Sequence, residues 1–440
     1  MGKCLRSRLA PSAAAASVLS KDLGISTDNT AKWLYESVGD GVGIRAQKYA
    51  RTQQTITRLE QQLTQHPTSR VVKARLDAER TNLATLIAEQ AKYTIKPGQL
   101  LIVDESSMSS TADLHQLHAQ VKAAGGKMLL VGDPKQLDAV EAGGFLGWME
   151  NEELSTNLTS VWRFHAEWEK QASLQLREGD VSVLDTYREH GRIIETSDAL
   201  DSAYSNWLAD TTSGQASVLI AGTNAEVQEL NLRAQTERIN RGDIDITTGF
   251  TIRSGNTAHT GDIILARQNN RKLLDSQGEF IKNGTRLTVD AIGTDIIEAT
   301  REDTGATITI PRTYAEDSIE LGYAATIHRA QGLTVETCHV AVDSSFGREQ
   351  LYVAMTRGKA SNTIYVDGEG EEKPESPDNW NMMHADVAEN SQEVLARVLA
   401  RSNRDKTAHE TMDAEHGWAY DLGRAVSELD YIHDCASEIW

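Results

Sequence analysis

The sequence predicts an α/β fold in which parallel strands are built from strand–turn–helix units. Near-continuous apolar runs recur along the chain, and several pass through a polar turn into helical patterning. Runs of this kind are typical of parallel strands buried on both faces, with ligand sites at the carboxyl ends of the strands. The runs are "QLLIVDE" (99–105), "GGKMLLVGD" (125–133), "ASVLIAGTNAEVQELNLRA" (216–234), "TCHVAV" (337–342) and "NTIYV" (362–366).

The bulk properties indicate a cytoplasmic globular protein. A length of 440 residues is enough for about three domains. Cys4, Cys338 and Cys435 are far apart and form no CxxC pair, which argues against a disulfide framework or a zinc site. We expect no membrane span, because no run of about 18 apolar residues occurs. The start "MGKCLRSRLAPSAAAASVL" only imitates a signal peptide, since its apolar part is mostly alanine.

The net charge of −20 disfavours binding to phosphate backbones, but the charge is unevenly distributed. From Glu371 onward, 16 acidic residues stand against 6 Lys and Arg, which accounts for half of the total. Between Arg45 and Lys92 the balance is reversed, with 9 Lys and Arg against 4 acidic residues. Local charge, rather than total charge, therefore decides the class of partner.

The segment from about 45 to 95 has helical periodicity and predicts an antiparallel hairpin. Apolar residues fall on one helical face before and after the turn "QHPTS" (65–69). They are Ile56, Leu59 and Leu63, then Val72, Leu76, Leu83 and Leu86. Two interpretations stay open: the hairpin is a solvated arm, or it contacts DNA.

The sequence pattern changes again between about 240 and 312. Glycines punctuate short β-rich pieces such as "DIILAR" and "TRLTVDAI", which suggests a small antiparallel barrel. Beyond Gly370 an acidic, proline-containing segment leads into helical patterning that continues to Trp440.

The first two apolar runs end in residues that suit phosphate chemistry. Asp104 and Glu105 follow "LLIV", where carboxylates hold magnesium and activate water in nucleotide hydrolases; the alternative is an acidic helix N-terminus closing a strand. Gly132, Asp133 and Pro134 follow "MLLV" and present Gln136 beyond the strand. A glutamine there can sense a γ-phosphate or position water, although an ordinary β-turn explains the same residues.

Two arginines and one polar stretch complete the candidate site. Arg163 in "SVWRFHAEWE" and Arg357 in "VAMTRGK" offer the fixed guanidinium fork that neutralises charge on phosphoryl oxygens. An isolated arginine is more often a surface residue. The stretch "GYAATIHRAQGLTVE" (322–336) suits contact with phosphates or a nucleic-acid backbone, and its alternative is a helix N-terminus with a buried histidine. Its candidate residues are Thr326, His328, Gln331 and Gly332.

Taken in order, these stretches resemble the helicase part of conjugative relaxases related to TraI, TraA and TrwC, a RecD-like branch of the superfamily 1 helicases. The resemblance covers roughly residues 9–435, and six ordered motifs make a chance match improbable. The stretch "LAPSAAAASVLSKDLGISTDNTAKWL" is similar to motifs Ia and Ib, "LIVDESSM" to motif II and "LLVGDPKQLDAVEAGG" to motif III. Motifs IV, V and VI correspond to "VWRFHAEWE", "YAATIHRAQG" and "LYVAMTRGKASN".

The resemblance implies two RecA-like domains and a set of roles. Residues 1–160 would form the first domain with the hairpin inserted, residues 161–370 the second with an SH3-like barrel inserted, and 371–440 a linker and helical extension. ATP and Mg²⁺ would be the cofactors, and single-stranded DNA the partner of a 5′→3′ motor. Asp104 would bind Mg²⁺, Glu105 would be the general base, Gln136 would couple γ-phosphate to DNA, and Arg163 and Arg357 would reach across the cleft. Asp133 and Gly332 would line the nucleotide site, and Pro11, Ser12, Thr30, Thr326, His328 and Gln331 would approach DNA.

One part of the family pattern is missing from this sequence. No G-x-x-x-x-G-K-[ST] loop occurs: "MGKC" has no preceding loop, and "GDGVG" (39–43) has no following lysine. No cluster of three histidines typical of the relaxase half occurs either. We expect a first domain incomplete at its N-terminus, from a truncated frame, a split gene whose upstream polypeptide supplies the loop, or a fragment. The alternative functions are a non-hydrolysing DNA-binding or scaffolding module and a kinase-like NTPase.

Overall fold

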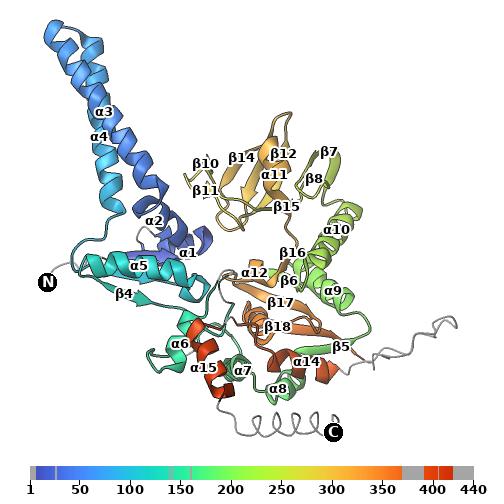
Figure 1. Ribbon diagram of the computed structural model, residues 1–440. Coiled ribbons are helices and arrows are strands. Elements are labelled where there is room, and N and C mark those ends of the chain that lie inside the picture. The colour runs from blue at the N-terminus through green and yellow to red at the C-terminus, as the bar shows by residue number, and fades with distance from the viewer. Residues whose placement is uncertain are drawn as a thin grey trace, which may run out of the picture.

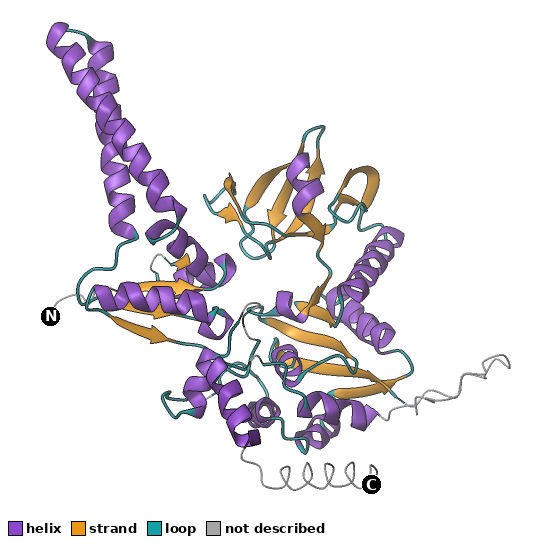
Figure 2. Ribbon diagram, viewed as in Figure 1, coloured by secondary structure: helices purple, strands orange, loops and turns teal. Residues whose placement is uncertain are grey.

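The architecture is mixed α/β, as the sequence predicts, with two parallel sheets side by side and a separate antiparallel region (Figures 1 and 2). It is seen in a computed structural model that describes residues 6–24, 27–137, 139, 142–158, 161–368, 391–404 and 406–419. No helix within these residues is long and apolar enough to cross a membrane.

The first sheet has four parallel strands in the order β2-β1-β3-β4. Helices α2 and α5 pack on one face through Trp33, Leu34, Leu114 and Leu117, against Leu101 of β3. The sequence did not predict β1, which pairs with β2 on one side and β3 on the other. The elements of this unit are β1 (Arg6–Ala10), α1 (Ala13–Leu23), β2 (Asp28–Asn29), α2 (Thr30–Ser37), β3 (Leu100–Val103), the 3-10 turn Ser106–Met108, α5 (Thr111–Ala123), β4 (Lys127–Leu130) and α6 (Phe145–Asn151).

The prediction that these strands are buried on both faces is wrong for the first sheet. In β3, Leu101 and Val103 are fully buried, but Leu100 and Ile102 on the opposite face are only half-buried. In and after β4, Leu129 is 47% exposed and Val131 is 40% exposed. An apolar run therefore signals a strand here, but the number of helical layers that cover it is decided by tertiary packing.

Two long helices project from the first unit (Figure 1). Helix α3 (Asp40–Gln65) and helix α4 (Arg70–Lys92) run side by side, and Ser69 caps α4 by accepting the amide N–H of Val72. Their shared seam is narrow, with Leu59, Leu76 and Leu86 buried. Most other side chains of the pair face solvent.

The second sheet has five parallel strands in the order β16-β6-β17-β18-β5. Every residue of β6 is buried, and so are the last six of β17. Helices α9 and α10 cover one face, and α7, α8, α13 and α14 cover the other. These elements are α7 (Glu167–Glu178), α8 (Val183–Glu189), β5 (Ile193–Thr196), α9 (Ala199–Thr212), β6 (Ser217–Ala221), α10 (Asn224–Asn240), β16 (Ala324–Thr326), α12 (Ile327–Ala330), β17 (Val335–Val342), α13 (Arg348–Ala354), β18 (Gly358–Asp367) and α14 (Ser391–Ala400).

Antiparallel strands fill the segment between α10 and β16, where the sequence predicts a barrel. Five strands pair in the order β14-β13-β12-β9-β15, and β7-β8 and β10-β11 form two further pairs. No pairing among the described strands closes this sheet, so a closed barrel stays a prediction. Lys282 donates from Nζ to Ser17 Oγ of α1 at 2.9 Å, which joins the region to the first unit. Its elements are β7 (Asp245–Thr251), β8 (Thr257–Thr260), β9 (Ile263–Ala266), β10 (Asn270–Leu274), β11 (Phe280–Ile281), β12 (Arg286–Ile292), β13 (Ile296–Arg301), β14 (Thr307–Pro311), α11 (Arg312–Ser318) and β15 (Ile319–Leu321).

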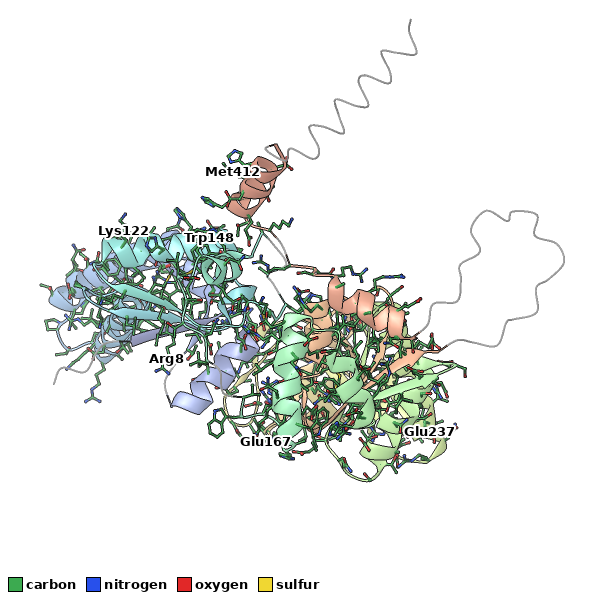
Figure 3. All side chains as sticks on the ribbon, turned by 90° about the horizontal axis from the view of Figure 1, so that it is seen from below. Arg8, Lys122, Trp148, Glu167, Glu237 and Met412 are labelled. Carbon is green, nitrogen blue, oxygen red and sulfur yellow. The ribbon has the colours of Figure 1, made fainter. Side chains whose placement is uncertain are left out.

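The described C-terminal helices cross from the second unit back to the first. Helix α14 buries Leu395 and Leu399 beneath the second sheet, whereas α15 (Ala408–Ala419) lies beside α6, as Figure 3 shows near Trp148 and Met412. The rings of His409 and Trp148 lie 5.7 Å apart, and Asn151 donates to Glu410 at 3.0 Å. The predicted acidic linker falls mainly on residues 369–390, which lie outside the described residues.

The open edge of β4 generates a prediction for hydrogen exchange. The amides of Lys127 and Val131 donate to Gln99 and Val103, so the amides of Met128 and Leu130 point away from β3, toward an edge with no described partner strand. We expect Met128 and Leu130 to exchange about tenfold to a hundredfold faster than Lys127 and Val131. Consecutive amides of β17, which has neighbours on both sides, are the control and should all exchange slowly. Equal protection along β4 would show that its edge is covered.

Candidate functional site

The carboxyl ends of β3 and β4 are tied together and carry the acidic candidates. Ser106 donates to the carbonyl of Val131 through its backbone N–H at 2.9 Å and its hydroxyl at 3.0 Å. Gly132 lies directly against this turn, since a Cβ there would stand 3.0 Å from the Ser106 nitrogen. Asp104, Glu105 and Asp133 are thereby held at one edge of the sheet, as their positions after two parallel strands predict.

Glu105 has an unusual backbone and an unusual carboxyl group. Its φ of 48° lies in the left-handed region, which a non-glycine residue occupies at an energetic cost, often where function requires a fixed direction. Burial and the neighbouring Asp104 carboxylate raise the pKa of Glu105 above its ordinary value, while attraction to Arg357 opposes this. A half-buried carboxylate of raised pKa is suited to accepting a proton.

Asp133 connects the two parallel-sheet units. Its Oδ1 accepts from Arg177 Nε at 3.1 Å, and its Oδ2 accepts from the Tyr352 hydroxyl at 3.0 Å. Arg177 lies on α7 and Tyr352 on α13, both beneath the second sheet. Gln136 donates to the same Oδ2 at 3.4 Å, so the predicted sensor and the connection between the units share one carboxylate.

The two candidate arginines come from the second unit and lie near Glu105. Arg357 is 1% exposed and donates to the carbonyl of Val353 at 2.7 Å and to the hydroxyl of Thr356 at 2.9 Å. Burial and repulsion from Arg163 lower the pKa of Arg357 to about 10, and attraction to Glu105 opposes this. Arg163 donates to the carbonyl of Thr356. The structure thus brings Glu105, Arg163 and Arg357 together.

A cavity of about 660 Å³ opens between the units beside these groups. Gln136 contributes from the first unit, and Arg163, Tyr352 and Thr356 contribute from the second. Trp162 at its margin is 87% exposed, an unusual state for so large an apolar side chain. The remaining lining residues are Val161, Phe164, His165, Ser173, Thr334 and Lys359.

The polar stretch after β16 lies at the carboxyl end of the second sheet. Thr326 ends β16, His328 is exposed on α12, and Gly332 has a φ of 83° in the turn that follows. The amide nitrogen and oxygen of Gln331 are both buried, and neither has a hydrogen-bond partner among the described residues. Because orphaned buried polar atoms are rare, Gln331 marks a position where a ligand group would supply partners.

The remaining candidates follow β1 in the first unit. Pro11 is half-buried, and Ser12 caps α1 by accepting the N–H of Ala15 at 3.0 Å while its side chain is exposed. Thr30 is 3% exposed and donates to the carbonyl of Ala10 at 3.3 Å. The Thr30 hydroxyl therefore joins α2 to β1 inside the unit, whereas the Ser12 side chain is exposed at the surface.

Sequence reasoning missed the partners of Asp133. Arg177 lies a few residues beyond the "SVWRFHAEWE" stretch, and Tyr352 lies in the "LYVAMTRGK" stretch, but neither stands out by residue type. The only available signal was that each occupies a helix adjoining a candidate arginine. Their role depends on a contact between residues 219 positions apart for Tyr352 and 44 for Arg177, which no local pattern reveals.

Several known proteins are similar to this chain in sequence or in fold. Residues 7–198 match a family described as an AAA domain. A conjugal transfer protein TraA of Agrobacterium fabrum is 28% identical over 342 residues, covering 76% of this chain and 28% of that protein. An ATP-dependent RecD2 DNA helicase of Deinococcus radiodurans is 30% identical over 274 residues, covering 60% of this chain and 36% of that protein. A crystal structure of Pif1 helicase from Bacteroides in complex with ADP-AlF3 and ssDNA aligns with a TM-score of 0.46 at 14% identity, over 96% of this chain and 89% of that one.

The AAA domain match and the similarity to a RecD2 DNA helicase relate this α/β chain to helicases. The chain is a homologue of the helicase portion of TraA-like conjugative relaxases and is also related to RecD2 helicases. The resemblance carried by its motifs is thereby confirmed. The chain spans only 24% to 28% of the length of the TraA proteins that it matches.

The bridge through Asp133 generates a prediction about stability. Asp133→Ala should lower the free energy of unfolding by about 1–3 kcal/mol, because it removes the acceptor of the half-buried Arg177 Nε and of the Tyr352 hydroxyl. Urea unfolding monitored by tryptophan fluorescence measures this change. The matched control is Asp185→Ala, which breaks an exposed pair with Arg188 and should cost no more than about 0.5 kcal/mol. An Asp133→Ala effect as small as that of the control would show that the bridge contributes nothing.

Proposed function

We propose that this chain is the motor portion of a conjugative relaxase, which moves 5′→3′ along single-stranded DNA by ATP hydrolysis. The observation that carries the proposal is that Asp133, next to the acids of the first unit, bonds Arg177 and Tyr352 of the second unit, where Glu105 interacts electrostatically with Arg357 and Arg163. Acids and arginines on opposite sides of a cleft are what phosphoryl transfer between two moving domains requires. The similarity to TraA proteins and to a RecD2 helicase supports a helicase-like role in conjugation.

The residues present suit one half of a nucleotide site. Asp104 would hold Mg²⁺, which supplies charge neutralisation when ATP is bound, and Glu105 would take the proton of the attacking water. The raised pKa of Glu105 supports this role, since a base works best near the operating pH. Arg163 and Arg357 would neutralise charge that develops on the phosphoryl oxygens. Gly332, whose left-handed turn ends α12, would line the same site.

Asp133 and Gln136 are suited to relaying the state of the nucleotide. Gln136 shares the Asp133 carboxylate with Arg177 and Tyr352, so movement of this glutamine would alter the bond between the units. Two sites are energetically coupled when each of them shifts the equilibrium of the same connecting element. We propose that this connection links hydrolysis to a change in the distance between the sheets.

The strand-binding surface would run along the carboxyl ends of both sheets. Ser12 offers an exposed hydroxyl near β1, and Thr326, His328 and Gln331 offer polar groups around α12. The two partnerless atoms of Gln331 support a ligand there most directly. A polar surface of this kind suits backbone contact without sequence preference.

A second candidate is a DNA-binding or scaffolding module that does not hydrolyse ATP. It is favoured by the absence of a G-x-x-x-x-G-K-[ST] loop from this sequence, since the loop amides and lysine cradle the β- and γ-phosphates. Under the first proposal a separate polypeptide or segment supplies that loop, and the relaxase half with it. The two candidates differ in ATP turnover and agree on DNA binding.

Turnover by this chain alone should be at least about a hundredfold slower than turnover by the same chain joined to a segment that carries the loop, because charge-stabilising contacts of this kind are worth that much. Hydrolysis is measured with and without single-stranded DNA. The control is Glu105→Gln, which should abolish the activity of the joined form. An inactive joined form would favour the second candidate. Rapid DNA-stimulated turnover by this chain alone, lost in Glu105→Gln, would show that no such loop is needed.

The helical hairpin should contribute salt-dependent affinity for DNA. Replacing residues 49–89 with a short Gly–Ser linker keeps Arg45 and Lys92, which pair with Glu36 and Asp28 at the base. We expect a shallower slope of log affinity against log salt, because fewer counterions are released when cationic contacts are removed. Fluorescence anisotropy with a labelled oligothymidylate measures the slope. An unchanged slope would identify the hairpin as a solvated arm.

A further inference from the structure

A second cavity, of about 300 Å³, lies between α10, the antiparallel region and α12. It is separate from the cleft beside Glu105 and shares no lining residue with it. Three of its lining residues are arginines from different elements: Arg253 follows β7, Arg267 follows β9 and Arg329 belongs to α12. The other lining residues are Asn224, Val227, Gln228, Asn231, Leu232, Ser254, Asn256, Glu320 and Leu321.

The three arginines share one carboxylate. Glu320 Oε2 lies 3.3 Å from Arg329 Nη1 and 3.5 Å from Arg267 Nε, and Oε1 lies 3.9 Å from Arg253 Nη1. No other carboxylate among the described residues lines the cavity, so three positive charges stand against a single negative one. Burial and repulsion from Arg267 lower the pKa of Arg329, and Glu320 only partly opposes this.

The guanidinium donors are also incompletely used. Arg329 donates from Nη2 to the side-chain oxygen of Asn224 at 3.0 Å, but the buried Nε of Arg267 meets Glu320 only as an ion pair at 3.5 Å and makes no hydrogen bond among the described residues. Arginine presents five N–H donors in a fixed fork, so one carboxylate with two oxygens cannot satisfy three such groups. A further oxyanion would supply the missing acceptors and balance the charge.

The walls of this cavity are held by buried polar bonds. Asp262 of the antiparallel region is fully buried and accepts from Gln235 of α10 at 2.7 Å and from the Tyr323 hydroxyl at 2.6 Å. The side-chain oxygen of Asn231 accepts the backbone N–H groups of Tyr323 and Ala324. The element that carries Arg329 is therefore fixed relative to the elements that carry Arg253 and Arg267, so little ordering is needed on binding.

We propose that Arg253, Arg267 and Arg329 form a binding site for a phosphate group of the single strand. The proposal rests on the proposed function for the identity of the strand. Arg329 directly follows His328, an exposed candidate strand contact, so the site adjoins the surface along which a strand would run. The cavity has no aromatic lining residue on which a base could stack, which favours the backbone as the part that is bound.

The test compares binding of a labelled oligothymidylate across a salt series. Arg267→Gln should weaken binding about tenfold at low salt and reduce the slope of log affinity against log salt by about 0.7, the value for one phosphate contact on a single strand. The control is Arg188→Gln, since Arg188 is similarly shielded but pairs with Asp185 and Glu195 on α8. Its binding should be unchanged. Equal binding by Arg267→Gln and the control would overturn the proposal.

Glu320→Gln distinguishes a binding site from a structural ion network, because the two predict opposite changes in affinity for the oligonucleotide. In a binding site it frees three arginines from the carboxylate that they share, so affinity for the oligonucleotide should rise several-fold. In a structural network it leaves buried charge unpaired, so the melting temperature and affinity should both fall without any ligand effect. The second result would overturn the proposal.

Inorganic phosphate distinguishes failure of this site from failure of the proposed function. Millimolar phosphate should raise the melting temperature of the wild type and of Glu320→Gln, but not of Arg267→Gln, at constant ionic strength. If phosphate does this while no oligonucleotide binds, the site stands as a phosphate site and the strand-binding function fails. A rise of equal size in all three proteins would overturn the site itself.

Discussion

The position of one carboxylate governs how the two parallel-sheet units meet. Asp133 lies in the loop after β4 and accepts hydrogen bonds from two helices of the other unit, through Arg177 and Tyr352. Because both oxygens are engaged, the relative position of the sheets is set by directional bonds rather than by apolar contact alone. The approach of Glu105 to Arg357, the cleft beside Gln136 and the return of α15 onto α6 all depend on the same relative placement.

The two parallel sheets are not equivalent in how they are stabilised. The second is covered by helices on both faces and buries β6 completely, whereas the first has one covered face and an edge strand, β4, that exposes Leu129. Apolar surface removed from water contributes roughly 25 cal/mol per Å², so the second unit is the stable platform. The acids are therefore carried by the less protected sheet and the arginines by the better protected one, a division that suits movement of one unit on the other.

The charged residues are also distributed unevenly over the molecule. The chain is acidic overall, yet it concentrates arginines at two places: Arg163 at the cleft with the buried Arg357 behind it, and the cavity around Glu320. Arg357, Arg267 and Arg329 are held partly out of solvent, where the electrostatic interaction with an anion is stronger than at an open surface, whereas Arg163 and Arg253 are exposed. A net charge of −20 thus limits nonspecific attraction to phosphate backbones without preventing binding at built sites.

The sequence by itself determined the strands and the acids that follow them, because buried parallel strands need apolar runs and their carboxyl ends bring polar residues to one edge. It also determined the family, since six motifs in order are carried by local stretches. Tertiary structure alone decided that the first sheet is covered on one face, that Thr30 is buried by its bond to Ala10, and that Arg357 is held inside its own unit. The same holds for the arginines around Glu320, which come from three separate elements. A local sequence pattern shows which kind of contact a segment needs. Which other segments provide that contact depends on packing between residues far apart in the chain.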